Sequence, residues 1–166
     1  NALLGKPAFI KLKMNSLSDY KMIDKLYDAS RAGVKIQLII RGICCLIPGV
    51  SGMSENIEAI SIVDNLLEHS RIYIFGNAGD PSIFISSADL MTRNIDERVE
   101  VTCPIYDEDI KQELLDTFEI YWSGNVKVRF HSEDLSNNYR NVQNSAFRAQ
   151  IQLYNYYRNK LDVITE

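Results

Sequence analysis

Two histidines are present in the chain, and they stand in different sequence contexts. His69 is followed by Ser70 and Arg71, where a helical segment is expected to give way to a strand. A histidine can attack or protonate a phosphoryl group while a neighbouring cation and a hydroxyl or backbone N–H hold its oxygens. The position alone would equally suit a structural histidine. His131 follows a short predicted strand and has no partner motif, so we expect it to be a surface residue.

The segment from Ser86 to Val101 favours the functional interpretation of His69. The segment contains Ser86, Ser87, Ala88, Asp89, Arg93, Arg98 and Glu100 in that order. This order resembles the second half of the phospholipase D signature, in which a small-small-Ala-Asn run precedes an arginine and a strand glutamate. His-Ser-Arg is similar to the opening His-x-Lys of that signature. Arg71 replaces the lysine, Asp89 replaces the asparagine, and the two halves lie farther apart than usual, which counts against a hydrolytic phospholipase or nuclease.

Arginines that follow predicted strands or lie in nearby loops are candidates for holding phosphate. These are Arg41, Arg71, Arg93 and Arg98. A planar guanidinium offers parallel donors to phosphate oxygens and stays charged at any working pH. The alternative for each is a solvated or glutamate-paired surface arginine. We expect Asp89 and Glu100 to orient His69 or an arginine rather than to act as catalytic bases.

The first forty residues predict the unit that would position Arg41. Residues 9–14 alternate apolar and basic residues and read as a strand, residues 21–32 have the spacing of an amphipathic helix, and residues 35–40 read as a second strand. Gly33 suits the end of the helix. A strand, a helix and a strand in so short a stretch indicate parallel pairing. Arg41 then stands at the carboxyl edge of the sheet, where open α/β sheets bind their ligands.

The rest of the chain predicts one α/β domain over residues 1–166, with a mixed β-sheet flanked by helices. We expect a partly helical segment over residues 54–69, a hairpin over 71–75 and 82–86, a strand over 99–105 stopped by Pro104, a helix over 107–122, a short strand over 126–130 that can lie at an edge, and a helix over 147–161. The apolar and aromatic residues of the last helix are expected in the core.

Composition excludes several classes of protein. The net charge is −4 and the isoelectric point is about 5.3, which argues against broad nucleic-acid binding. No apolar run approaches the roughly 20 residues that span a bilayer, and the first residues lack the pattern of a signal peptide. The odd number of cysteines indicates neither a disulfide framework nor a zinc site. We expect Cys44, Cys45 and Cys103 to be buried in a reducing cytoplasm.

The chain resembles the last domain of bacterial polyphosphate kinases over nearly its whole length. The matching segments are 41–49, 54–57, 60–63, 67–73, 86–89, 91–94, 98–101 and 148–150. In that family, two consecutive phospholipase D-like domains face each other across a tunnel. The resemblance, together with the absence of an initiator methionine, implies that this sequence is part of a longer enzyme.

What this resemblance implies is reversible transfer of the terminal phosphoryl group of ATP to polyphosphate, through a phosphohistidine and with magnesium. The phosphorylated histidine and the magnesium ligands of the family belong to the preceding domain, so no metal ligand is assigned here. The resemblance makes His69 the second catalytic histidine and Arg41 and Arg98 ligands of the nucleotide phosphates. The possible supporting residues are Arg71, Arg93, Ser86, Ser87, Asp89 and Glu100.

The resemblance also implies that ATP, ADP, polyphosphate and the upstream domains are partners, and that the full-length protein is a cytoplasmic homo-oligomer, with peripheral membrane association as an alternative. The isolated domain is expected to be inactive. Two other functions stay open. One is a phospholipase D-type phosphodiesterase that acts as a dimer with one signature per chain, and the other is a non-catalytic module that binds nucleotides or polyanions.

Overall fold

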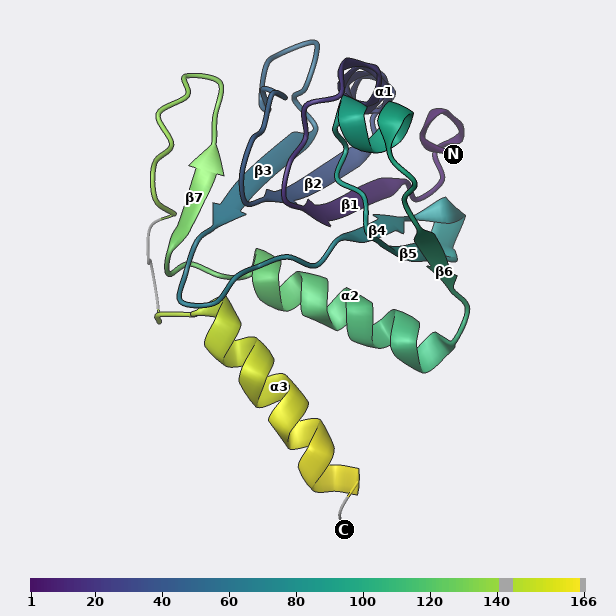
Figure 1. Ribbon diagram of the computed structural model, residues 1–166. Helices are drawn as coiled ribbons and strands as arrows, with labels where there is room; N and C mark the ends of the chain where they lie inside the picture. Colours follow the sequence, from purple (N-terminus) through teal and green to yellow (C-terminus); the bar gives the residue numbers. More distant parts are fainter. Residues whose placement is uncertain (141–144, 165–166) are drawn as a thin grey trace.

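A seven-stranded mixed sheet forms the centre of the molecule, in the order β6-β5-β4-β1-β2-β3-β7 (Figure 1). The structure is a computed structural model that describes residues 1–140 and 145–164. The strands are β1 (Phe9–Met14), β2 (Lys35–Ile40), β3 (Ile57–Ile62), β4 (Ile72–Phe75), β5 (Ser82–Ser86), β6 (Thr102–Ile105) and β7 (Val128–His131). The helices are α1 (Tyr20–Arg31), α2 (Glu108–Trp122) and α3 (Ala149–Ile164), with short helical turns η1 (Ala2–Leu4), η2 (Asn77–Gly79) and η3 (Arg93–Glu97). The predicted α/β class, with a mixed sheet flanked by helices, is confirmed.

The predicted parallel unit at the start of the chain is confirmed as well. β1 pairs in parallel with β2 along its whole length. Between them, α1 is capped at its N-terminus by Asp19, whose carboxylate accepts a hydrogen bond from the backbone N–H of Met22. Gly33 follows the helix in a left-handed conformation with φ 85°. β3 is parallel to β2, and β4 is antiparallel to β1. The carboxyl ends of β1, β2 and β3 and the first residue of β4 therefore lie along the same side of the sheet, at the ends of its strands.

The segment between residues 54 and 69 differs from its prediction. The partly helical interpretation is wrong, because Ile57–Ile62 forms β3, between β2 and the edge strand β7. Every residue of β3 except Glu58 is buried. A strand that is covered on both faces has an almost continuous apolar sequence and lacks the alternation by which strands are recognised.

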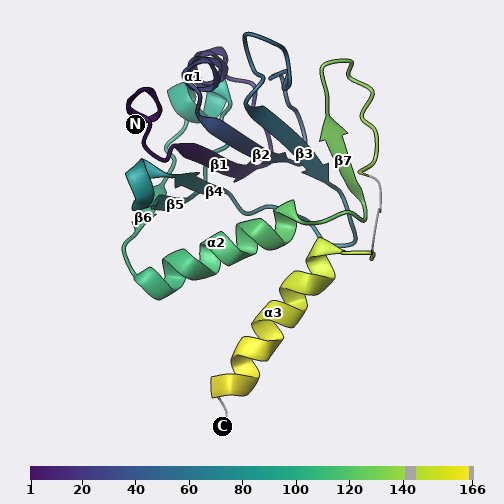
Figure 2. The ribbon, with the colours of Figure 1, turned by 180° about the vertical axis from the view of Figure 1, so that it is seen from behind.

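Helices cover both faces of the sheet (Figures 1 and 2). On the α1 face, Leu12 and Leu38 belong to a buried cluster with the apolar side of the helix. On the α2 face, Phe118 and Tyr121 belong to a second cluster that includes Ile60. The two faces are thus held by separate apolar layers, and residues at the strand ends are left to build a site.

The strand predicted over residues 99–105 is shorter than expected. Val99 and Val101 are 100% and 67% exposed, and pairing with β5 begins only at Thr102. Pro104 does not stop the strand but lies within it, opposite Phe84. A proline is tolerated there because β6 is at the edge of the sheet, where one side of the strand needs no ladder partner.

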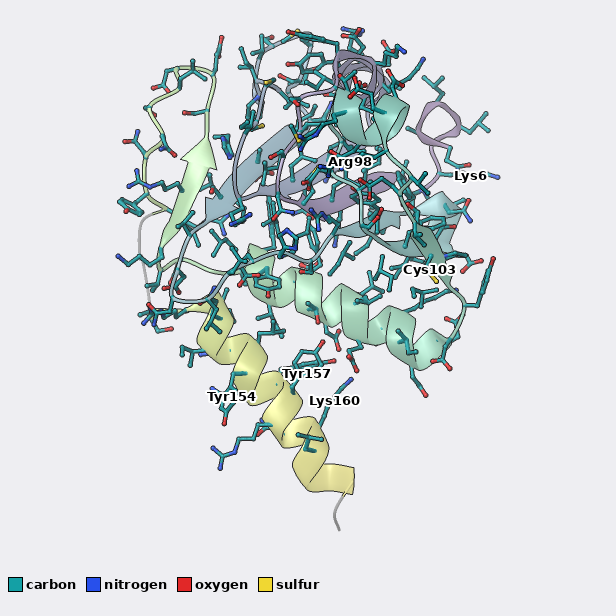
Figure 3. All side chains as sticks on the ribbon, viewed as in Figure 1. Lys6, Arg98, Cys103, Tyr154, Tyr157 and Lys160 are labelled. Carbon is teal, nitrogen blue, oxygen red and sulfur yellow. The ribbon has the colours of Figure 1, made fainter. Side chains whose placement is uncertain are left out.

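The C-terminal helix is less buried than predicted. Tyr154 is 64% exposed, whereas Tyr157 lies with its hydroxyl 3.1 Å from Thr117 Oγ1, and Lys160 pairs with Glu113 of α2. Figure 3 shows Tyr157 and Lys160 on the side of α2 and Tyr154 on the other side of the helix. α3 extends beyond the sheet, so no further layer covers its outer side within residues 1–140 and 145–164.

The cysteine prediction is wrong too, since Cys44 is half-buried and Cys45 and Cys103 are exposed. Cys44 and Cys45 lie in the loop after β2, where Cys44 packs against the cluster on the α1 face, and Cys103 lies on the edge strand β6. In the part of the chain that the structure describes, no helix combines the length and apolar character needed to cross a membrane.

Candidate active site

The site is assembled at the edge of the sheet where β1 and β2 end. Arg41, directly after β2, donates from Nε to Asn15 Oδ1 (3.1 Å). Asn15, directly after β1, donates from its backbone N–H to Asp89 Oδ1 (2.8 Å) and from Nδ2 to the same oxygen (3.2 Å). One side of the Arg41 guanidinium is thereby fixed. Its terminal nitrogens have no protein acceptor among the described residues, so they are free to bind an anion.

Asp89 also holds the second arginine of the site. Arg71 donates from Nε to Asp89 Oδ1 (3.2 Å) and from NH2 to Oδ2 (3.1 Å), and the two side chains are 13% and 11% exposed. The remaining nitrogen, NH1, donates to the carbonyl oxygen of His69 (3.2 Å) and lies 3.4 Å from His69 Nδ1. Arg71 is therefore committed to a bidentate ion pair and to the backbone beside the candidate histidine.

The Asp89 carboxyl is kept ionised by these contacts. Burial raises the pKa of Asp89, but hydrogen bonds from Arg71 and from the backbone N–H of Asn15, with the charge of Arg71, outweigh burial and hold the pKa below its ordinary value. Asp89 thus links Arg41, through Asn15, to Arg71 and His69 in one hydrogen-bonded chain.

A second, buried ion pair lies beneath His69. Lys13 Nζ is 3.2 Å from Glu68 Oε2, and both side chains are almost inaccessible, at 3% and 8% exposed. Lys13 also donates to Ser70 Oγ (2.9 Å) and to the Ser70 carbonyl oxygen (3.4 Å). The residues on both sides of His69 are therefore fixed by one lysine, while His69 itself is exposed. Sequence reasoning missed Lys13, because in the alternating apolar and basic residues 9–14 it has the position of an ordinary solvent-facing strand lysine.

Positive charge accumulates around Lys13. Burial lowers its pKa, Glu68 partly opposes this, and the charges of Arg41 and Arg71 lower the pKa further. With the Lys13 and Arg71 charges balanced by carboxylates, Arg41 supplies the unpaired positive charge of this part of the site.

The first turn of α3 anchors the loop that carries His69. Gln150 Nε2 donates to Glu68 Oε1 (2.7 Å) and to the carbonyl oxygen of Leu66 (2.8 Å). Arg148, just before the helix, donates from Nε to Asp64 Oδ2 (2.8 Å). The loop between β3 and β4 is therefore tied at three points to the start of α3, about 84 positions later in the chain.

The segment that contains the second half of the signature is braced internally. Glu100 accepts from Ser87 Oγ and from Asn94 Nδ2 (2.6 Å). These two hydrogen bonds, Ser87 first, lower the pKa of Glu100. Ser86 Oγ accepts from the Ala88 backbone N–H (3.1 Å). These hydrogen bonds of Glu100 and the two serines fix the conformation of the loop between β5 and β6. Among the described residues, Glu100 does not contact His69.

Two predicted arginines lie outside the hydrogen-bonded chain. Arg93, in η3, and Arg98, immediately after it, are both exposed and make no ion pair within residues 1–140 and 145–164. Arg98 is labelled in Figure 3. His131 was expected at the surface, and that prediction is wrong. It is half-buried, with Nε2 3.4 Å from the Ile40 carbonyl oxygen, because β7 places it beside the loop that follows β2. Within the described residues, there is no group of three or more His, Cys, Asp or Glu that could hold a metal ion.

Comparison with known proteins gives consistent results. The family model described as polyphosphate kinase C-terminal domain 2 matches residues 1–150. The polyphosphate kinase of Vibrio vulnificus strain YJ016 is 52% identical over 160 residues, and that of Escherichia coli K12 is 49% identical over 160 residues. Each alignment covers 96% of this chain and 23% of the relative, so the chain spans about a quarter of the length of these proteins.

Solved structures agree in fold. The crystal structure of polyphosphate kinase from Porphyromonas gingivalis superposes with a TM-score of 0.93 at 43% identity, over 96% of this chain and 25% of that one. Nuc of Salmonella typhimurium, a phospholipase D family member, gives a TM-score of 0.58 at 13% identity, over 79% of this chain and 86% of that one. At that identity the likeness concerns the fold alone, and it confirms the phospholipase D-like architecture.

The first prediction tests the ion pair at the centre of the site. Asp89→Asn should lower the free energy of unfolding of the chain by about 1.5–3 kcal/mol near neutral pH, because Arg71 loses a charged, bidentate acceptor. The depressed pKa of Asp89 also sets a pH dependence. Its stabilisation is present above the ordinary value of 3.8 and is lost as the pH falls toward the lower pKa of the folded state.

Urea unfolding at about pH 7 and about pH 3 measures both effects. The difference between wild type and Asp89→Asn should shrink in acid. A difference that is the same at both pH values would show that the carboxylate charge does not stabilise the fold.

The second prediction concerns the pair beneath His69. Lys13→Met should cost about 3–5 kcal/mol of stability, because Glu68 is left as a buried, uncompensated charge. The double variant Lys13→Met/Glu68→Gln should be less destabilised than the single one, since Glu68→Gln removes that charge and keeps an amide oxygen that can accept from Gln150. Urea unfolding of Lys13→Met, Glu68→Gln and the double variant gives the coupling free energy between the two side chains. If the losses of stability in the two single variants simply add up to the loss in the double variant, there is no direct ion pair.

Proposed function

The chain belongs to the polyphosphate kinase family, as its second C-terminal domain, and from that membership we propose that it helps to transfer the terminal phosphoryl group of ATP reversibly to polyphosphate. The rest of such an enzyme, which includes the phosphorylated histidine, lies outside this chain. The observation that supports the proposal is the hydrogen-bonded chain from Arg41 through Asn15, Asp89 and Arg71 to His69. It combines an anchored guanidinium with an exposed imidazole at the ligand-binding edge of an α/β sheet.

In this proposal Arg41 binds the nucleotide phosphates. Phosphoryl transfer needs mainly positioning and neutralisation of charge, and a guanidinium whose Nε is fixed by Asn15 can offer its terminal nitrogens in a defined direction. Arg98, which is exposed after η3, would also contact the nucleotide phosphates. Arg71 contributes through Asp89 and His69 and does not bind phosphate directly.

His69 is proposed to act on the oxygen between the transferred phosphoryl group and ADP. An arginine cannot accept a hydrogen bond, so in the contact between Arg71 NH1 and His69 Nδ1 the nitrogen Nδ1 is the acceptor. In the neutral imidazole the proton is then on Nε2, which is free to donate to the bridging oxygen. That hydrogen bond strengthens as the P–O bond breaks and negative charge develops on the departing phosphate.

The remaining partners are proposed from the family alone. They are ATP or ADP, polyphosphate, the upstream domains and further copies of the full-length protein. Magnesium would neutralise charge on the phosphates when bound, and from the family resemblance we assign its ligands to the upstream domain. The phosphodiesterase alternative loses support from the structure of the signature itself. The two residues that depart from it, Arg71 and Asp89, are bonded to each other.

The third prediction tests His69 in the full-length enzyme. His69→Ala should lower turnover by about 10²–10⁴, the usual range for a general acid–base group, with a much smaller change in nucleotide affinity. The measurement is the rate of phosphohistidine formation on the upstream domain in a single turnover. His69→Gln should retain part of the rate through its amide donor. Equal rates for wild type and His69→Ala would show that His69 has no part in the chemistry.

The fourth prediction tests Arg41. Arg41→Ala should raise the nucleotide KM and slow turnover, with a loss of about 1.5–3 kcal/mol, or tenfold or more. Arg41→Lys should rescue this only partly, because a point charge cannot replace two parallel hydrogen bonds. Arg31→Ala is a matched control, since Arg31 ends α1 and pairs with Asp28 on the surface. If Arg41→Ala behaves like Arg31→Ala in steady-state kinetics, Arg41 is structural.

A further inference from the structure

A hollow of about 630 Å³ opens beside Arg41. Its walls include Arg41 from the end of β2, Ser61 from β3, Lys127 from the turn before β7, and Arg129 and His131 from β7. The order of the sheet places Arg71 and His69 at the start of β4, Asn15 at the end of β1, Arg41 at the end of β2, and this hollow at β3 and β7. Arg41 therefore stands between the candidate active site and the hollow. The volume is in the usual range for a ligand site.

The hollow is positively charged without compensation. Among the residues that the structure describes, its lining contains two arginines and a lysine but no aspartate or glutamate. Arg129 is held by neutral groups, since NH1 donates to the carbonyl oxygen of Asn137 (2.9 Å) and NH2 donates to the Tyr139 hydroxyl (2.7 Å). The guanidinium also stacks 3.8 Å from the centre of the Tyr139 ring. These contacts fix the position of Arg129 and leave its charge unpaired.

Lys127 adds a charge from a strained position. Its backbone has φ 59°, in the left-handed region that costs free energy for any residue with a side chain. Lys127 forms no ion pair within residues 1–140 and 145–164. The carboxylate whose pKa it lowers, Asp64, is bound by Arg148. A strained backbone that is retained beside a cationic hollow is an arrangement typical of binding sites.

These observations determine the kind of ligand. Unpaired cations that line a mainly polar hollow suit a chain of phosphates, and the hollow adjoins the arginine proposed for the reacting phosphates. One face of the Tyr139 ring, the aromatic ring in the lining, is already covered by Arg129. Resting on the proposed function, we propose that Lys127 and Arg129 form a second phosphate subsite, which holds the polyphosphate chain beyond the phosphoryl group that reacts near His69.

The experiment uses the full-length enzyme with ADP and either long-chain polyphosphate or tripolyphosphate. The main variant is Lys127→Gln/Arg129→Gln. The KM for long-chain polyphosphate should rise about tenfold or more, and its dependence on salt should become shallower, because two charge-assisted contacts are lost. The KM for ADP and for tripolyphosphate should change less than about twofold, since these ligands end before the subsite.

Two further variants separate binding from folding and from general loss of charge. Lys127→Gly removes the charge but also relieves the positive φ, so the melting temperature should not fall while the KM for long chains still rises. Lys21→Gln/Lys25→Gln removes two charges from side chains that are 85% and 81% exposed on α1, and it should leave every KM unchanged.

The outcomes distinguish the subsite from the function on which it rests. An unchanged KM for long-chain polyphosphate in Lys127→Gln/Arg129→Gln would overturn the subsite while the kinase function stands. A higher KM for ADP with an unchanged KM for polyphosphate would assign the hollow to the nucleotide and would also overturn it. A wild-type enzyme that cannot phosphorylate ADP from polyphosphate would instead overturn the proposed function.

Discussion

The ion pair between Arg71 and Asp89 is the contact on which the candidate site depends. It joins four segments that are distant in the sequence, namely the start of β4, the loop after β5 and, through Asn15, the ends of β1 and β2. Both partners are largely removed from solvent, so the loss of either would leave a charge without compensation. The pair therefore fixes the positions of His69 and Arg41 relative to each other, and Asn15 provides the contact with Arg41.

The same pair explains how this chain departs from the phospholipase D signature without losing its architecture. A lysine and an asparagine in the signature correspond here to Arg71 and Asp89. An aspartate adds a negative charge and an arginine adds a fork of donors, and the two changes compensate each other in a bidentate contact. The local consequence is that Arg71 is neutralised. Free positive charge for a phosphate ligand must then come from Arg41 and, in our proposal, from Lys127 and Arg129.

The sequence predicts the elements that are governed by local patterns, and it misses contacts that depend on distant segments. The parallel unit of β1, α1 and β2 follows from periodicity and from Gly33, and it places Arg41 at the correct edge. β3 escapes prediction because burial on both faces removes its alternation. In the sequence Lys13 is an ordinary strand lysine, and only in the fold do Glu68 and Ser70, more than fifty residues away, close over it. His131 is likewise brought beside Ile40 only by the sheet order.

The arrangement of charge along the sheet edge reconciles the acidic net charge of the protein with the anionic ligand that we propose for it. The chain carries −4 overall, with 18 basic and 22 acidic side chains. At the edge, however, the carboxylates of Glu68, Asp89 and Asp64 are each bound to a buried or half-buried cation, so they position residues and repel little. Arg41 and Arg129 are instead fixed by neutral partners. Because β1, β2 and β3 end, and the antiparallel β7 begins, on this side of the sheet, Arg41, Lys127 and Arg129 lie along one line although they are far apart in sequence. In our proposal a flexible polyanion follows this line of cations without attraction to the rest of the surface.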